Sequence, residues 1–255
     1  MVACWLAFAT FSIYASDYNP GLLTQNLAVV AFIISIGADL LIDFASIAFT
    51  LNSISGEINV KHWDLIRMSM VNRQDIIVAK HAIAGIRTWR MMGVITIFRS
   101  ISALMLILSL FIPYTSGHGL TITDILAAFE NDFIQIALLM LTVITFFAIY
   151  LVEPNWRMAA QTAAGLAISA RVHNPVFAAL AALAYIVGIW IAQVIIFALC
   201  AWMTFNTLLG IATAPAAMCV VFFACVGTAV IVYSFYYWVR QWALDYALRH
   251  AFKND

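Results

Sequence analysis

Residues 176–202, VFAALAALAYIVGIWIAQVIIFALCAW, form a run without a single Asp, Glu, Lys or Arg. Roughly 20 helical residues cross the hydrocarbon core of a bilayer, and this run is longer than that. It lies within an uncharged stretch that extends from Val172 to Val239. Of the 255 residues, 65% are hydrophobic and 9% are charged, and the mean hydropathy is +1.00. Since a water-soluble fold of this size cannot bury so much apolar surface, the sequence predicts an integral membrane protein.

Six apolar runs are candidates for membrane spans, at residues 1–16, 27–50, 93–113, 132–152, 176–202 and 214–239. None of them alternates with the period of two that marks the strands of a membrane β-barrel. We therefore expect an all-α integral membrane protein with six transmembrane helices in a single polytopic domain, residues 1–255. The first run would measure only about 24 Å as a helix, which suggests that Met1 is not the true start.

In this six-span plan the three outer loops contain no Lys or Arg, and the twelve basic residues lie toward the other side of the membrane, with Arg99 just inside the third span. Short loops rich in Lys and Arg stay in the cytoplasm. We therefore predict a multi-pass protein of the cell membrane with the N- and C-termini cytoplasmic and His118 on the outer side. The net charge of 0 offers no basic surface to nucleic acid.

Residues 52–92, the linker between the second and third spans, are too polar to cross a membrane but are patterned like helices. A first helix over residues 60–70 would place Trp63, Ile66 and Met70 on one face. An apolar face on the cytoplasmic side is expected to pack against another surface. We interpret these three residues as anchors of a protein contact.

A second linker helix is predicted from Asn72, because Asn followed three residues later by Asp75 is typical of a helix N-terminus. Arg73, Lys80 and Arg87 recur every seven residues along this helix. A basic stripe of this kind also suits the lipid headgroup region, and that alternative stays open.

The linker contains three motifs in succession: Ser53-x-Ser55-x-Glu57, Trp63-Asp64-Leu65-Ile66-Arg67 and Arg73-x-Asp75-Ile76-Ile77-x-Ala79-Lys80. In this order they resemble the linker between the second and third spans in permeases of type-2 ATP-binding-cassette exporters. The resemblance implies a permease that works as a dimer with a separate cytoplasmic ATPase subunit. It also implies that the linker meets the ATPase through a set of six residues: Glu57, Trp63, Ile66, Arg67, Met70 and Lys80.

The sequence contains no motif that would make the chain an enzyme. It lacks G-x-x-x-x-G-K-[ST], so the chain does not cradle nucleotide phosphates by itself, and ATP hydrolysis would belong to a partner. The five histidines lie outside the apolar runs, and the four cysteines are scattered without metal-ligand spacing. We expect no enzymatic activity, no cofactor and no metal site.

Three ionisable residues fall inside the predicted spans: Asp39, Asp43 and Arg99. An ionisable side chain within a membrane is costly unless it is paired or hydrated. Asp39 and Asp43 are four residues apart and share one helix face, and Asp43 and Arg99 lie at similar depths in consecutive spans. We predict an ion pair between Asp43 and Arg99 that fixes the two helices, with proton or ion coupling through Asp39 as the alternative.

Two groups of small residues predict close helix packing. Ala184, Gly188 and Ala192 form a ridge on the fifth span, whose partner is another span or a second protomer. After the fourth span, Pro154 is expected in the first turn of a new helix. The small and polar residues that follow it are interpreted as internal packing, with a second ATPase contact as the alternative: Ala160, Gln161, Ala164, Gly165 and Ser169.

The first functional hypothesis is a membrane permease subunit of an ATP-driven exporter. The uncharged stretch Val172–Val239 offers no charged groove, so a hydrophobic or lipid-like cargo is expected. The expected partners are a cytoplasmic ATPase, a second permease protomer or other membrane subunits, and lipids. The alternative is a non-catalytic structural helical subunit of a larger membrane complex, redox or photosynthetic.

Overall fold

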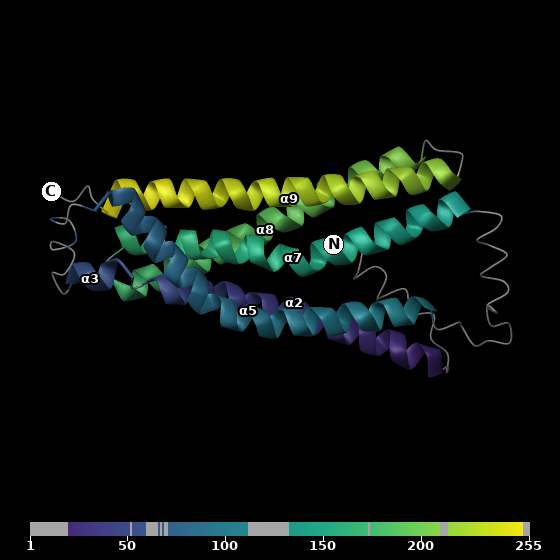
Figure 1. Cartoon of the computed structure of the whole chain (residues 1–255), viewed down its shortest axis with the longest axis horizontal. Coiled ribbons are helices and arrows are strands. Elements are labelled where there is room, and N and C mark those ends of the chain that lie inside the picture. The colour runs from purple at the N-terminus through teal and green to yellow at the C-terminus, as the bar shows by residue number, and fades with distance from the viewer. Residues whose placement is uncertain are drawn as a thin grey trace. The chain divides into compact units, whose positions relative to one another are not determined.

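The computed structural model describes residues 20–51, 53–59, 66, 68, 71–111, 133–172, 174–209 and 214–251. Within these ranges the chain is helical and contains no strand, which confirms the predicted all-α class. Its long helices are α2 (Pro20–Leu51), α5 (Arg73–Phe111), α7 (Phe133–Arg171), α8 (Pro175–Leu209) and α9 (Ala214–Ala251) (Figure 1). A short helix, α3 (Ser55–Asn59), follows α2. The first predicted span, residues 1–16, lies outside the described residues.

Three of the described segments are long and apolar enough to cross a membrane: Ile33–Glu57, Pro175–Leu209 and Ala216–Ala251. Each overlaps one of the predicted spans, those at residues 27–50, 176–202 and 214–239. By length and composition the chain is therefore an all-α protein with candidate membrane spans.

The helices continue well beyond the apolar runs that predicted them. α5 begins at Arg73, so the second linker helix and the third predicted span form one helix. α7 passes through Pro154 and ends at Arg171, so the prediction that a new helix begins at Pro154 is wrong. α8 likewise continues to Leu209, seven residues beyond the end of the predicted span 176–202. An apolar run marks only part of a helix, because backbone hydrogen bonding continues where the side chains are polar.

The N-terminus of α5 has the predicted cap. Asn72 Oδ1 accepts a hydrogen bond from the backbone N–H of Gln74 at 3.2 Å, and the Asn72 carbonyl oxygen accepts one from the N–H of Asp75 at 3.0 Å. Asp75 adds a negative charge in the first turn, where it complements the helix dipole. The predicted start of the second linker helix at Asn72 is therefore confirmed.

The chain divides into two compact units that share the long helices. Unit 1 comprises Met1–Ile36, Ile97–Leu151 and Gln193–Ile231, and unit 2 comprises Gly37–Thr96, Val152–Ala192 and Val232–Asp255. Unit 2 contains the linker and most of the buried side chains that the structure describes.

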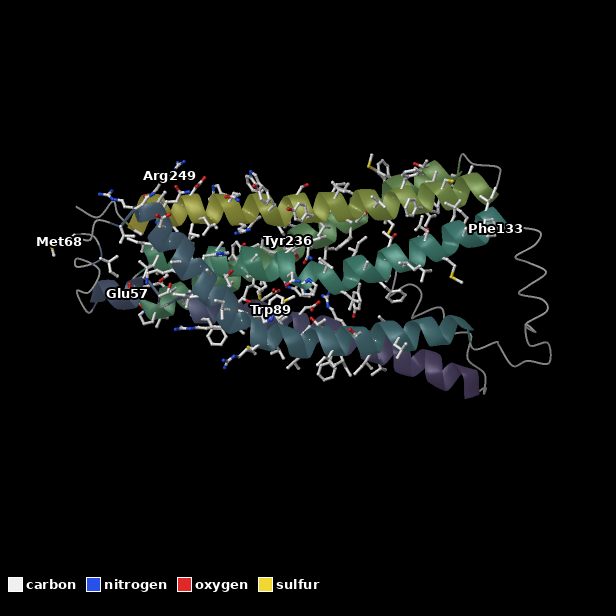
Figure 2. All side chains as sticks on the ribbon, viewed as in Figure 1. Glu57, Met68, Trp89, Phe133, Tyr236 and Arg249 are labelled. Atoms are coloured by element: carbon white, nitrogen blue, oxygen red, sulfur yellow. The ribbon has the colours of Figure 1, made fainter. Side chains whose placement is uncertain are left out.

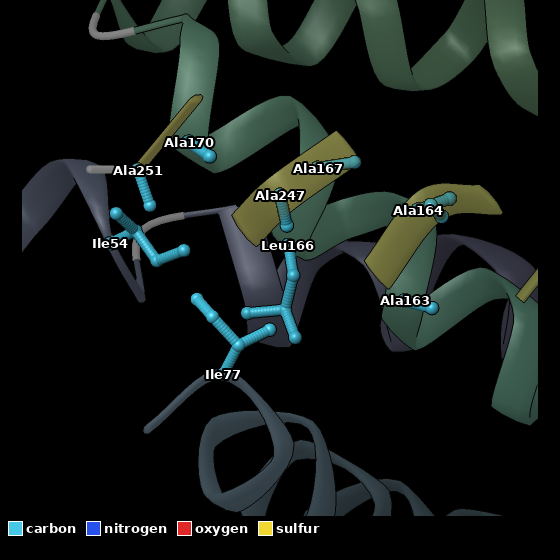
Figure 3. Packing of buried hydrophobic residues seen from close by; sticks show 10 residues of the cluster. Ile54, Ile77, Ala163, Ala164, Leu166, Ala167, Ala170, Ala247 and Ala251 are labelled. Carbon is cyan, nitrogen blue, oxygen red and sulfur yellow. The ribbon is translucent and has the colours of Figure 1, made fainter. Parts of the chain in front are cut away.

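The core of unit 2 joins the linker to α7 and α9. Ile54, Ile77 and Leu166 are buried and point toward one another (Figure 3). Small side chains from α7 and α9 pack around them: Ala163, Ala164, Ala167, Ala170, Ala243, Ala247 and Ala251. Small residues let helices approach closely. The interpretation of the second half of α7 as internal packing is confirmed, since Ala160, Gln161, Ala164 and Ser169 are all buried.

Candidate functional site

A buried ion cluster joins α2 and α7 in unit 2, and it consists of Asp39, Asp43, Glu153 and Arg157. Arg157 Nη2 lies 2.7 Å from Asp39 Oδ2. Arg157 Nε lies 3.5 Å from Asp43 Oδ1 and 3.6 Å from Glu153 Oε1. The side chains of Asp39, Asp43 and Arg157 are at most 6% exposed. A buried guanidinium is therefore held among three carboxylates.

Two aromatic residues extend the ion cluster. Trp190 Nε1–H on α8 donates a hydrogen bond to Asp43 Oδ2 at 2.9 Å, and the Trp190 ring centre lies 5.7 Å from the guanidinium carbon of Arg157. From α9, the hydroxyl of the buried Tyr236, which is labelled in Figure 2, donates a hydrogen bond to Glu153 Oε1 at 3.2 Å. Four helices of unit 2 thus supply the ion cluster and its aromatic neighbours.

The sequence pointed to Asp39 and Asp43 as buried ionisable residues but not to their partner in unit 2. The six-span plan assigned Arg157 to a cytoplasmic loop, because the fourth apolar run ends at residue 152, just before Glu153. The structure continues α7 through this position and brings Arg157 to both aspartates. A signal was present, since Glu153, Arg157 and Gln161 recur every four residues and share one face of a continuous helix.

Arg99, the third ionisable residue predicted within the membrane, contacts Tyr150 in unit 1. Arg99 Nη1 donates a hydrogen bond to the Tyr150 carbonyl oxygen, and the guanidinium lies 4.6 Å from the centre of the Tyr150 ring. In a regular helix this carbonyl would bond to the N–H of residue 154, but Pro154 has none. Arg99 supplies the donor that Pro154 lacks, which helps α7 to continue through a proline. Asp43 and Arg99 belong to different units, and their predicted ion pair stays a prediction.

We expect Arg99→Met to lower the free energy of unfolding by about 1–3 kcal/mol, because a buried carbonyl would lose its donor. In a Pro154→Ala background the new N–H of residue 154 can bond to that carbonyl, so the cost of Arg99→Met should decrease. The rescue should be partial, since Arg99 makes further interactions. Thermal unfolding of the four proteins in one detergent measures this coupling. Equal costs of Arg99→Met in both backgrounds would refute the assigned role.

The linker is fixed by a clasp that consists of Ser53, Glu57 and Lys80. Lys80 Nζ lies 2.7 Å from Glu57 Oε2 and donates a hydrogen bond to the Ser53 carbonyl oxygen at 2.8 Å. Because Lys80 belongs to α5 and Glu57 to α3, the clasp holds α3 against the first turns of α5. Glu57 and Lys80 were both predicted to bind a partner, and the structure pairs them with each other.

A second set of hydrogen bonds ties the linker to α7. Ser169 Oγ accepts hydrogen bonds from the backbone N–H groups of Ile54 and Ser55, both at 3.1 Å. Ser55 Oγ donates in turn to the carbonyl oxygen of Leu51 at 3.1 Å. The turn between α2 and α3 is thus attached to the C-terminal end of α7.

Trp63, Ile66 and Met70 were predicted to form the partner-binding face of the linker. Of these three, the structure describes Ile66, which packs against the core of unit 2. Its neighbour Met68 is 74% exposed. Trp63, Arg67 and Met70 lie outside the described residues. The contact with an ATPase therefore stays a prediction.

His81 on α5 contacts α7 close to the linker. Its Nε2 lies 3.0 Å from the Ala159 carbonyl oxygen and 3.2 Å from the Thr162 hydroxyl. Because a carbonyl oxygen only accepts hydrogen bonds, Nε2 carries the ring proton. Burial lowers the pKa of His81 below its ordinary value of 6.5, the hydrogen bond to Ala159 opposes this shift, and the positive charge of Arg240 adds to it. The fold therefore favours the neutral ring.

The stability of the protein should decrease on acidification. His81 binds a proton more readily in the unfolded chain, so its contribution is fully present above pH 6.5 and is lost as the pH falls through the lower pKa of the folded state. Between about pH 7 and pH 5, the melting temperature of the wild type should fall more than that of His81→Gln, whose amide can still donate to Ala159. Parallel pH profiles of the two proteins would contradict this assignment.

The predicted packing ridge on α8 lies outside the described core of unit 2. Ala184 and Gly188 are exposed and Ala192 is half-buried, and a methyl group added at Gly188 would meet no described atom within 4 Å. The buried face of α8 consists of other residues: Ala178, Ala182, Ile186 and Ile189. The role of the ridge in packing against a further molecule stays a prediction.

Among the described side chains, no group of three or more His, Cys, Asp or Glu residues could hold a metal ion. Comparison of the chain with protein-family models, with curated proteins and with solved structures finds no match. The ion cluster and the clasp are therefore the features from which a function can be inferred.

Proposed function

We propose that this chain is the permease subunit of an ATP-driven exporter that is energised by a separate cytoplasmic ATPase. The observation that carries the proposal is the attachment of the described parts of the linker, in which the clasp holds α3 to α5 and Ser169 holds the preceding turn to α7. Coupling between distant parts of a protein travels through rigid, packed elements. A linker fixed in this way suits the transmission of a partner's movement.

The linker is connected to three long helices along which a displacement can travel. α2 leads into it at Leu51, α5 carries Lys80 of the clasp and continues to Phe111, and α7 contributes Ser169. A force applied to α3 would act on all three helices at once. This arrangement suits a permease that alternates between inward- and outward-facing states, and the proposal includes a second protomer.

The proposal includes six spans with both termini in the cytoplasm. Two observations support it: the three membrane-length segments, and the absence of Lys and Arg from the three outer loops of the six-span plan. The uncharged stretch Val172–Val239 covers α8 and much of α9, whose exposed side chains are largely apolar. A hydrophobic or lipid-like cargo suits such helices.

Purification in mild detergent followed by mass spectrometry tests the proposal. We expect an ATPase subunit in stoichiometric amount with the wild type. Trp63→Ala combined with Met70→Ala should release it, because a few aromatic and aliphatic anchors carry most of a protein contact. Trp89→Ala is the matched control, since Trp89 is 60% exposed on α5 beyond the clasp and its loss should leave the ATPase bound.

Melting temperatures of all variants must be measured in parallel, so that lost folding is not mistaken for lost binding. A wild-type protein that purifies without an ATPase would overturn the proposal. Stable association with subunits of a redox or photosynthetic complex would favour the structural-subunit hypothesis instead. An ATPase that stays bound to the Trp63 and Met70 double variant would remove these two residues from the contact.

A further inference from the structure

α2 and α7 run parallel in unit 2 with a constant register. Asp43 contacts Arg157, and Thr50 lies against Gly165. Beyond the end of α2, Ser55 of α3 continues the series by contacting Ser169. The residue numbers in these pairs differ by 114 or 115, and Arg157 and Gly165 also contact the residues one turn earlier on α2, Asp39 and Ile47. This register assigns Ser46 and Gln161 to one level, between the ion cluster and the Thr50–Gly165 contact.

Ser46 and Gln161 carry polar groups that have no hydrogen-bond partner within the part of the chain that the structure describes. Both residues are 0% exposed, and among the described residues neither Ser46 Oγ nor either amide atom of Gln161 makes a hydrogen bond. One turn away, Asp43 Oδ1 also accepts no hydrogen bond, and Arg157 Nε lies 3.5 Å from it. Unsatisfied buried polar groups destabilise a fold, so a molecule that bonds to them would stabilise this one.

Tyr185 on α8 adds a fourth polar group near this level. Trp190 bonds to Asp43, and Ile186 packs against Ile47, so α8 runs antiparallel to α2 and brings Tyr185 beside the same cluster. Within the described residues the Tyr185 hydroxyl has no hydrogen-bond partner. The Tyr185 side chain packs against the buried cluster of Ile47 and Ile186, and Ile47 is one turn from Asp43. The register of α2 with α7 and the antiparallel direction of α8 therefore place polar atoms without a described partner at about the same level on three helices.

The charges and hydrogen-bonding properties of these groups favour a neutral ligand over a cation. Their oxygen atoms could surround a cation, but the Arg157 guanidinium is 3.5 Å from Asp43 Oδ1, and like charges about 4 Å apart repel strongly inside a protein. A molecule that both donates and accepts hydrogen bonds fits better, because the carboxylate only accepts, the Gln161 NH₂ group only donates, and the hydroxyls do either. Water meets this requirement, and a buried water makes about three such bonds.

We propose that Asp43, Ser46, Gln161 and Tyr185 form an internal water site between α2, α7 and α8. The water bridges the Ser46 hydroxyl and the Gln161 amide and bonds to the Asp43 carboxylate. It joins the ion cluster to the close contact of α2 with α7 and satisfies polar groups that would otherwise oppose folding.

Gln161→Met and Ser46→Ala test the site in the purified full-length protein, because each removes hydrogen-bonding groups with little change in shape. If a water bridges the two residues, each variant should lower the melting temperature by about 2–4 °C. The double variant should then lose less than the sum, since the water is already gone. In a dry site each substitution would remove an unsatisfied group and raise the melting temperature. A rise, no change, or strictly additive losses would overturn the proposal.

X-ray radiolytic footprinting gives a second readout that does not depend on a stability difference. Hydroxyl radicals formed from a bound water oxidise the side chains beside it, so modification of Tyr185 should fall several-fold from the wild type to Gln161→Met. Tyr236, which is 1% exposed and bonded to Glu153, is the internal reference. Equal Tyr185 modification in both proteins would overturn the water site. A melting temperature that rises with sodium but not with choline at equal ionic strength would also overturn it, in favour of a cation.

Discussion

Arg157→Met should lower the free energy of unfolding by about 3–5 kcal/mol, the usual cost of removing one partner from a buried ion pair. Met retains an apolar side chain of moderate length but removes the charge. Asp39, Asp43 and Glu153 would then lose the cation that all three contact, and buried like charges disfavour one another. Thermal unfolding of the purified protein in detergent measures the loss.

Arg171→Met is the matched control for this substitution. Arg171 lies on the same helix but is exposed, and it donates a hydrogen bond to the Tyr246 hydroxyl. An exposed contact contributes at most about 1 kcal/mol. Adding Asp43→Asn to Arg157→Met should restore part of the lost stability, because one uncompensated carboxylate disappears. Similar costs for Arg157→Met and Arg171→Met would mean that the ion cluster contributes little.

Gly165→Ala should destabilise the protein by about 1–3 kcal/mol through overpacking. A Cβ atom at Gly165 would lie 1.8 Å from Thr50 Oγ1 and 3.2 Å from the Cα atom of Ile47. Thr50 is held in place, because it is 0% exposed and its hydroxyl donates to the Ile47 carbonyl oxygen at 2.8 Å. The added methyl group must therefore push α2 and α7 apart.

Gly188→Ala is the control, because a Cβ atom there meets no described atom within 4 Å. Ala is favoured over Gly within a helix by about 1 kcal/mol, so this variant should melt at the same temperature as the wild type or higher. Thr50→Ala, which removes the closest atom, should relieve part of the cost of Gly165→Ala. Equal melting temperatures of Gly165→Ala and Gly188→Ala would show that α2 and α7 do not meet at this level.

Features that depend on neighbouring residues could be predicted from the sequence. The helix start was predicted from Asn72 and Asp75, which are three residues apart, and the bond that forms the cap reaches only two residues, from the Asn72 side chain to the backbone of Gln74. The runs at 176–202 and 214–239 predicted α8 and α9, because apolar length alone marks a membrane-length helix. The ends of the helices were less accurate. A hydrophobicity pattern does not predict that polar residues continue a helix, as the residues after Pro154 do.

The linker illustrates the same limit. Glu57 and Lys80 were singled out as partner-binding residues, but no local rule pairs two residues that are far apart in the sequence. The structure joins them at 2.7 Å because α3 folds back against α5. Whether the clasp also contacts an ATPase depends on a second protein. Purification in mild detergent followed by mass spectrometry tests that contact directly.

Composition and local spacing were sufficient for the all-α class, for the membrane-length segments and for the recognition that Asp39, Asp43 and Arg99 would need partners. The partners themselves depend on tertiary structure. Arg157 reaches both aspartates because α2 and α7 are parallel in a register that the close contact at Gly165 permits. Hydrophobicity and helix capping act over a few residues, whereas an ion cluster between helices depends on how their faces pack, and the spacing along one helix does not contain that information.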